Sequence, residues 1–141
     1  MTGTEKSPLF ADLVFNEEGE RAEIATIGGE PFYAVPDDGF LRHVEAEYVD
    51  RQIVEALQEH LRGMKHVVTE GVIQMLGEET LFTRASIEHA IENMDRILEP
   101  GAVDADELRT ALWMAGFRAV IDVHGDLVQL DMPGPEERPE P

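Results

Sequence analysis

The stretch that decides the fold is residues 41–76, LRHVEAEYVDRQIVEALQEHLRGMKHVVTEGVIQML. Apolar side chains recur along it every three or four residues, which is the period of one face of an α-helix. The pattern keeps its phase through Gly63, so it predicts either one long helix bent at that glycine or two helices that meet there. The apolar positions are Leu41, Val44, Tyr48, Ile53, Leu57, Leu61, Met64, Val68, Val72 and Met75.

An unbroken helix of this length would extend about 54 Å. That is long for a chain of 141 residues, which is close to the commonest size of a single domain. The stripe therefore favours pairing with another copy of the chain. Large apolar side chains on other predicted elements add to that expectation, because such groups are enriched in protein interfaces. The interface candidates are Tyr33, Tyr48, Leu57, Leu61, Met64, Trp113 and Met114.

Short segments rich in β-branched and aromatic residues precede the helical stretch. Residues 9–15, 21–27 and 30–35 predict three strands, separated by turn residues at 16–19 and by Gly28-Gly29. The turn residues at 36–39, Pro-Asp-Asp-Gly, predict the end of this antiparallel meander.

Two shorter helices and a hairpin are predicted after Gly77. Thr83 is the candidate N-cap of a helix that ends before Pro100, and Asp104 with Glu107 resembles the capping box of a helix that ends at Gly116. Residues 117–123 and 126–132 predict a closing hairpin.

The order of these elements predicts an α+β fold, with an N-terminal three-stranded antiparallel meander, three to four central helices and a C-terminal β-hairpin. Residues 9–132 are expected to form one domain. It would lie between a flexible N-terminus, residues 1–8, and a disordered Pro/Glu tail, residues 133–141.

The composition restricts the classes of partner. Thirty Asp and Glu against eleven Lys and Arg give a formal charge of −19. Because such a surface repels phosphate groups, neither nucleic acid nor an anionic membrane is an expected partner. Cysteine is absent, which excludes disulfides and thiolate chemistry. Residues 1–8 lack the features of a signal peptide, and no long apolar run occurs, so we expect a cytoplasmic protein.

Histidine and glutamate side chains supply an alternative hypothesis, a small enzyme or metal-binding protein. His43 and Glu47 are four residues apart on the predicted helix, and His60 and His89 lie further along the helical region. The competing interpretation is that these residues lie on solvated helix faces. No zinc-protease, di-iron, phosphate-binding or serine-nucleophile motif occurs, so we predict no catalytic residue and no cofactor.

The sequence thus favours a non-enzymatic interaction protein, comparable to an adaptor or chaperone, that acts as a homo-oligomer. Its partner would be another copy of the chain or another protein. Basic proteins are included among the candidates, because an acidic surface attracts basic partners and repels acidic ones. The acidity has two candidate explanations, the function of the protein and the organism.

Overall fold

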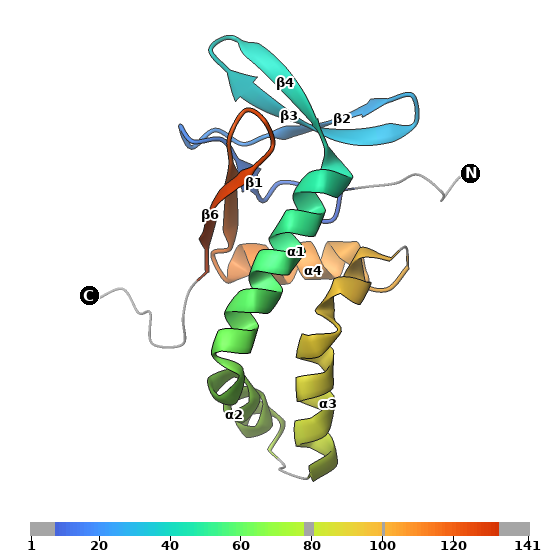
Figure 1. Cartoon of the computed structure of the whole chain (residues 1–141), viewed down its shortest axis with the longest axis vertical. Coiled ribbons are helices and arrows are strands. Elements are labelled where there is room, and N and C mark those ends of the chain that lie inside the picture. Colours follow the sequence, from blue (N-terminus) through green and yellow to red (C-terminus); the bar gives the residue numbers. More distant parts are fainter. Residues whose placement is uncertain (1–7, 78–80, 100, 133–141) are drawn as a thin grey trace. The chain divides into compact units, whose positions relative to one another are not determined.

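The computed structural model describes residues 8–77, 81–99 and 101–132. Its contacts divide the chain into two compact units, one of Met1–Ile53 with Val103–Pro141 and one of Val54–Ala102. The predicted α+β class is confirmed: the described residues form four α-helices and two three-stranded sheets (Figure 1). That residues 9–132 form a single domain stays a prediction, and the predicted Pro/Glu tail lies outside the described residues.

The first unit contains the expected antiparallel meander. It consists of β2 (Glu23–Ile27), β3 (Glu30–Asp37) and β4 (Phe40–Glu45), in that order in the sheet. The β3–β4 connection is the two-residue turn Asp38-Gly39, with φ values of 54° and 87°. Positive φ at both turn positions matches the twist of the flanking strands, which is why Asp-Gly is favoured there.

The strands of the meander differ from those predicted. The sequence predicts a helix from Leu41, but residues 40–45 pair with β3 from Asp37–Phe40 to Phe32–Glu45. The three-residue spacing of Leu41 and Val44 suggests a helix, but in β4 it places the two side chains on opposite faces of the strand. The tight turn at Asp38-Gly39, which pairs residues 40–45 with β3, decides in favour of the strand. The helical stretch therefore begins at Ala46.

The first predicted strand is mostly a turn. Only Val14–Phe15 (β1) is extended, and it pairs in parallel with β5 (Arg118–Ile121), which pairs in turn with β6 (Leu127–Asp131). The β5–β6 hairpin was predicted. The parallel partner of β1 was not, because local patterns carry no information on a pairing so distant in sequence.

Helices α1 (Ala46–Gly63) and α4 (Ala105–Met114) contribute to the first unit. The N-cap predicted at Asp104 is confirmed, since its side chain accepts hydrogen bonds from the backbone N–H groups of Asp106 and Glu107. Ten of the buried side chains in this unit are Phe10, Leu13, Val14, Tyr33, Val35, Val49, Ile53, Phe117, Ala119 and Ile121.

The second unit is helical. It contains the remainder of α1, α2 (Lys65–Leu76), α3 (Leu81–Glu92) and the short 3₁₀ helix η1 (Met94–Leu98). The helical stretch is thus two helices, which separate at Gly63–Met64. The Gln58 Nε2 donates to the carbonyl oxygens of Ile91 and Glu92, at 3.0 and 2.9 Å, and so satisfies acceptors at the end of α3. No helix in the described ranges is long and apolar enough to cross a membrane.

Candidate functional site

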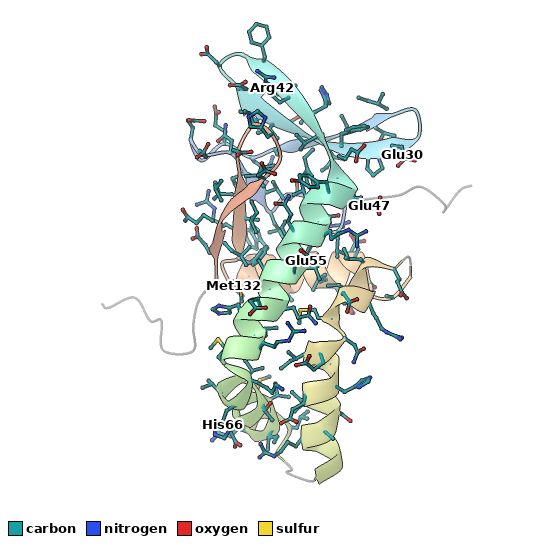
Figure 2. All side chains as sticks on the ribbon, in the orientation of Figure 1. Glu30, Arg42, Glu47, Glu55, His66 and Met132 are labelled. Carbon is teal, nitrogen blue, oxygen red and sulfur yellow. The ribbon has the colours of Figure 1, made fainter. Side chains whose placement is uncertain are left out.

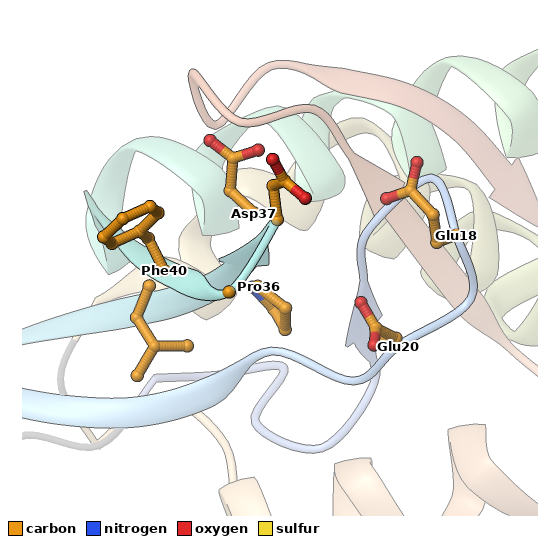
Figure 3. A pocket seen from close by; sticks show the side chains of 8 residues that line it. Glu18, Glu20, Pro36, Asp37 and Phe40 are labelled. Carbon is orange, nitrogen blue, oxygen red and sulfur yellow. The ribbon is translucent and has the colours of Figure 1, made fainter.

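An open hollow of about 690 Å³ lies between the loop after β1 and the β3–β4 hairpin (Figure 3). The buried side chain of Asn16 connects these two segments. Its Oδ1 accepts the backbone N–H groups of Glu18 and Glu20, at 3.0 and 2.7 Å, and its Nδ2 donates to the carbonyl oxygen of Pro36 at 3.0 Å. We call this hollow the acidic hollow; it is lined by Glu18, Glu20, Pro36, Asp37, Asp38, Gly39, Phe40 and Leu41.

The acidic hollow combines negative charge with exposed apolar surface. Asp37 forms an ion pair with Arg42, at 2.8 Å, whereas the carboxylates of Glu18 and Asp38 make no hydrogen bond or ion pair with another described residue. Phe40 is 75% exposed and Leu41 is 55% exposed. An aromatic ring therefore stands in solvent beside unpaired carboxylates, an arrangement that suits a partner with both cationic and apolar groups.

A smaller hollow of about 280 Å³ has different chemistry. Arg109 and Trp113 are four residues apart and lie on one face of α4. The Arg109 side chain is fixed by Asp106, at 2.7 Å, and by the carbonyl oxygen of Pro8, at 2.9 Å. Trp113 is 69% exposed. We call this hollow the arginine groove; it is lined by Ala11, Asp12, Leu13, Arg21, Arg109, Thr110 and Trp113.

A buried carboxylate lies inside the first unit. The Tyr33 hydroxyl donates to Asp50 Oδ1 at 2.6 Å, and the Leu9 backbone N–H donates to Asp50 Oδ2 at 2.8 Å. Burial raises the pKa of Asp50 to about 6, against the opposing effects of these hydrogen bonds and of Arg109. Burial also raises the pKa of Tyr33 well above its ordinary value. Neither residue lines the acidic hollow or the arginine groove. Because Asp50 on α1 accepts hydrogen bonds from Leu9 and from Tyr33 on β3, it links the N-terminal segment to β3 and α1.

The predicted interface residues divide into buried and exposed sets. Tyr33 is fully buried and Leu57 is 7% exposed, so both belong to the core and neither is available to a partner. Leu61 and Met64 are half-buried. The remaining three candidates, Tyr48, Trp113 and Met114, are exposed.

Tyr48 has a structural role in addition to its exposed ring. Its hydroxyl donates to Asp126, and this hydrogen bond raises the Tyr48 pKa above its ordinary value. Gln52, one turn further along α1, donates to the carbonyl oxygen of Gly125 at 2.8 Å and accepts the Leu127 N–H at 3.0 Å. These contacts fix the turn between β5 and β6 against α1.

The predicted metal ligands are not brought together. His43 lies on β4, so it does not form the helical pair with Glu47 that the sequence suggested. Glu47, labelled near the start of α1 in Figure 2, instead pairs with Arg51 at 3.1 Å. His60, on α1, and His89, on α3, are exposed side chains of the second unit. Within the part of the chain that the structure describes, no three His, Asp or Glu side chains are placed to hold a metal ion.

Sequence reasoning missed Phe40 and Arg21. The signal for Phe40 was present: an aromatic residue directly after Asp38-Gly39 lies at the tip of a hairpin, far from most of the side chains that could cover it. Arg21 could not be found in this way, because its neighbours in the arginine groove come from α4, far along the chain. Comparison with known proteins adds no candidate residue, since no family model, curated protein or solved structure matches this chain.

Proposed function

We propose that this chain is a non-enzymatic interaction module that binds a basic, partly apolar segment of another protein in the acidic hollow. The observation that supports the proposal is the exposure of Phe40, at 75%, beside four carboxylates. An exposed aromatic side chain is a common binding anchor, and charged groups near it orient the partner. A cationic segment with one apolar side chain would meet both features at once.

The two features contribute differently to binding. Burial of an aromatic side chain stabilises a complex by about 1.5–3 kcal/mol. An exposed ion pair contributes about 0–1 kcal/mol, because solvent screens it. Phe40 would therefore supply most of the affinity, while the carboxylates orient the partner. The net charge of −19 adds long-range attraction that raises the association rate of a basic partner.

Self-association through this surface is disfavoured. In a twofold dimer the same patch meets itself, so the four carboxylates would face four more. Homo-oligomerisation by another surface stays a prediction. We place the protein in the cytoplasm as part of the same proposal. The alternative of a small enzyme or metal-binding protein gains no support from the described residues, whose His, Asp and Glu side chains form no ligand cluster.

A binding titration tests the proposal. The probe is a dye-labelled peptide of alternating lysine and leucine, followed by fluorescence anisotropy. Phe40→Ser is expected to weaken binding by about tenfold or more, since each 1.4 kcal/mol corresponds to a factor of ten. The matched control is Ile27→Ser, which removes another exposed apolar side chain, 52% exposed, outside the hollow.

A second pair of variants separates local charge from net charge. Glu18→Gln/Asp38→Asn removes two carboxylates of the hollow, and Glu17→Gln/Glu23→Gln removes two outside it. We expect the first pair to weaken binding more than the second, with an effect that shrinks as salt screens the charges. If Phe40→Ser weakens binding no more than Ile27→Ser, and Glu18→Gln/Asp38→Asn no more than Glu17→Gln/Glu23→Gln, the peptide follows net charge alone. The hollow would then be rejected as the binding site.

A further inference from the structure

Strand β4 has one open edge, because it is the last strand in the sheet order β2-β3-β4 (Figure 1). In an antiparallel hairpin with a two-residue turn, the residues that flank the turn exchange hydrogen bonds, and bonded and non-bonded pairs then alternate. The first bonded pair is Asp37–Phe40, so every second residue of β4 from Phe40 bonds to β3. The backbone N–H and C=O groups of Leu41 and His43 therefore point away from β3.

The hydrogen bonds around β4 agree with this alternation. Pro36 is the cross-strand partner of Leu41, and its carbonyl oxygen accepts Asn16 Nδ2 at 3.0 Å instead of an N–H group of β4. Within residues 8–77, 81–99 and 101–132, the backbone groups of Leu41 and His43 have no hydrogen-bond partner. Leu41 is 55% exposed, and His43 is exposed as well. Four backbone polar groups thus face solvent along this edge.

We propose that the basic segment bound at the acidic hollow is extended and adds to the open edge of β4 as an antiparallel strand. The inference rests on the function proposed above and specifies the class of partner, a strand-forming segment in which basic and apolar residues alternate. Leu41 connects the two sites, since it lines the hollow and also supplies outward-facing backbone groups. In strand addition, main-chain hydrogen bonds supply affinity and alternate side chains supply specificity.

The side chains of β4 fit a segment of this kind. Successive side chains of a strand point to opposite faces of the sheet. Phe40 and Val44 share one face with Arg42, whose charge is balanced by Asp37 at 2.8 Å. Apolar side chains of the added strand would lie on that face. Its basic side chains would lie on the other face, near the exposed carboxylate of Glu45, which has no ion pair among the described residues.

The sequence of β4 lacks the features that prevent pairing at an edge. Protected edges carry lysine, proline, a bulge or a covering element. The strand, FLRHVE, has no lysine or proline, and its register with β3 is regular from Phe40 to Glu45. A second copy of the chain is a poor occupant, because two molecules that each carry a net charge of −19 repel each other. A basic segment is attracted by the same charge.

Amide hydrogen exchange tests the proposal residue by residue. The full chain is measured by NMR, through magnetisation transfer from water, with and without a saturating unlabelled peptide of alternating lysine and leucine. Exchange of the Leu41 and His43 amides is expected to slow by about tenfold or more, because the added strand accepts their hydrogen bonds. The matched control is the open edge of β2, where the amides of Ile24 and Thr26 point outward by the same alternation and should not change.

Backbone methylation of the peptide supplies a second test that leaves the protein unchanged. In antiparallel pairing with the leucines on the Phe40 face, the lysine N–H groups point toward β4. Methyl groups on the lysine backbone nitrogens should therefore weaken binding by about tenfold or more. The same number of methyl groups on the leucine backbone nitrogens should weaken it less. Equal affinities of the two methylated peptides would overturn the proposal.

The exchange experiment separates this inference from the proposed function. Binding without slower exchange of Leu41 and His43 would overturn strand addition and leave binding at the hollow intact. Equal slowing of Ile24 and Thr26 would indicate a general stabilisation of the sheet and would also overturn it. Absence of binding by the unmodified peptide would reject both proposals. Slow exchange in the free chain that disappears on dilution would assign the edge to a second copy, against the proposal.

Discussion

Replacement of Asp50 by asparagine should change how the stability of the first unit depends on pH. Burial raises the pKa of Asp50 from its ordinary 3.8 to about 6 in the folded protein. Between these values the unfolded chain has released the proton of Asp50 while the folded chain still holds it, so rising pH favours unfolding. At about 1.4 kcal/mol per pKa unit, the free energy of unfolding falls by about 3 kcal/mol across this range.

The expected result is a difference between the parent and Asp50→Asn in how the free energy of unfolding depends on pH. The stabilising contribution of protonated Asp50 is fully present below pH 3.8 and is lost as the pH rises through about 6. Asp50→Asn cannot ionise, so its unfolding free energy relative to the parent should rise by about 3 kcal/mol over that range. The other Asp and Glu residues are common to both proteins and cancel in the comparison. The absolute offset between the curves depends on how asparagine replaces the hydrogen bonds from Tyr33 and Leu9.

Urea unfolding followed by Trp113 fluorescence measures these curves, because Trp113 lies in the same unit. Dilute protein is needed, since the isoelectric point of about 4.4 falls within the range. Tyr33→Phe supplies a second test: it removes a hydrogen bond that lowers the pKa of Asp50, so the decline in stability should extend to higher pH. Parallel curves for the parent and Asp50→Asn would refute the assignment of a raised pKa to Asp50.

Two further substitutions test the packing of each unit. Gly125 has a φ of 86°, and an added Cβ would lie 3.0 Å from Val44 Cβ, so Gly125→Ala should destabilise the first unit by about 2 kcal/mol or more. Gly19→Ala, at a φ of 87° with open space around it, is the control and should cost about 1–2 kcal/mol from the backbone alone; equal costs in chemical denaturation would contradict the close contact. Thr69 is 1% exposed and its hydroxyl has no hydrogen-bond partner among the described residues, so Thr69→Val should stabilise the second unit by about 1 kcal/mol in thermal unfolding followed by circular dichroism. A lower melting temperature would show that this hydroxyl has a partner.

Most of the secondary structure follows from local chemistry. Turn residues, the Asp104 cap and the apolar period between Ala46 and Leu76 mark elements that the structure contains. The errors occur where local signals fit two structures. Leu41 and Val44 continue the helical spacing of the residues that follow, although they lie in a strand. Phe10 and Leu13 are apolar because they pack in the core from a turn, not because the segment is extended.

The candidate surfaces were less predictable than the fold. Each combines residues from distant segments, such as Arg21 with Trp113, and no spacing in the sequence indicates that these residues lie close together. Burial was equally hard to infer. The sequence suggested that Tyr33 is an exposed aromatic residue at an interface. In the structure its hydroxyl donates to the buried carboxylate of Asp50, and a pattern of apolar residues does not indicate such a partner.

The exposed apolar side chains lie mainly at the ends of elements. Phe40 follows a hairpin turn, Trp113 and Met114 end α4, and Met75 and Leu76 end α2. Most apolar side chains on the helix faces pack in the core of their own unit. The end of an element lies near solvent because the chain turns there, so an apolar side chain at that position is more often exposed. A partner would therefore contact turns and helix ends, where substitutions change binding with little effect on folding. That separation explains why Phe40→Ser is a sharper test of function than any change within the apolar stripe of residues 41–76, where lost stability and lost binding could not be told apart.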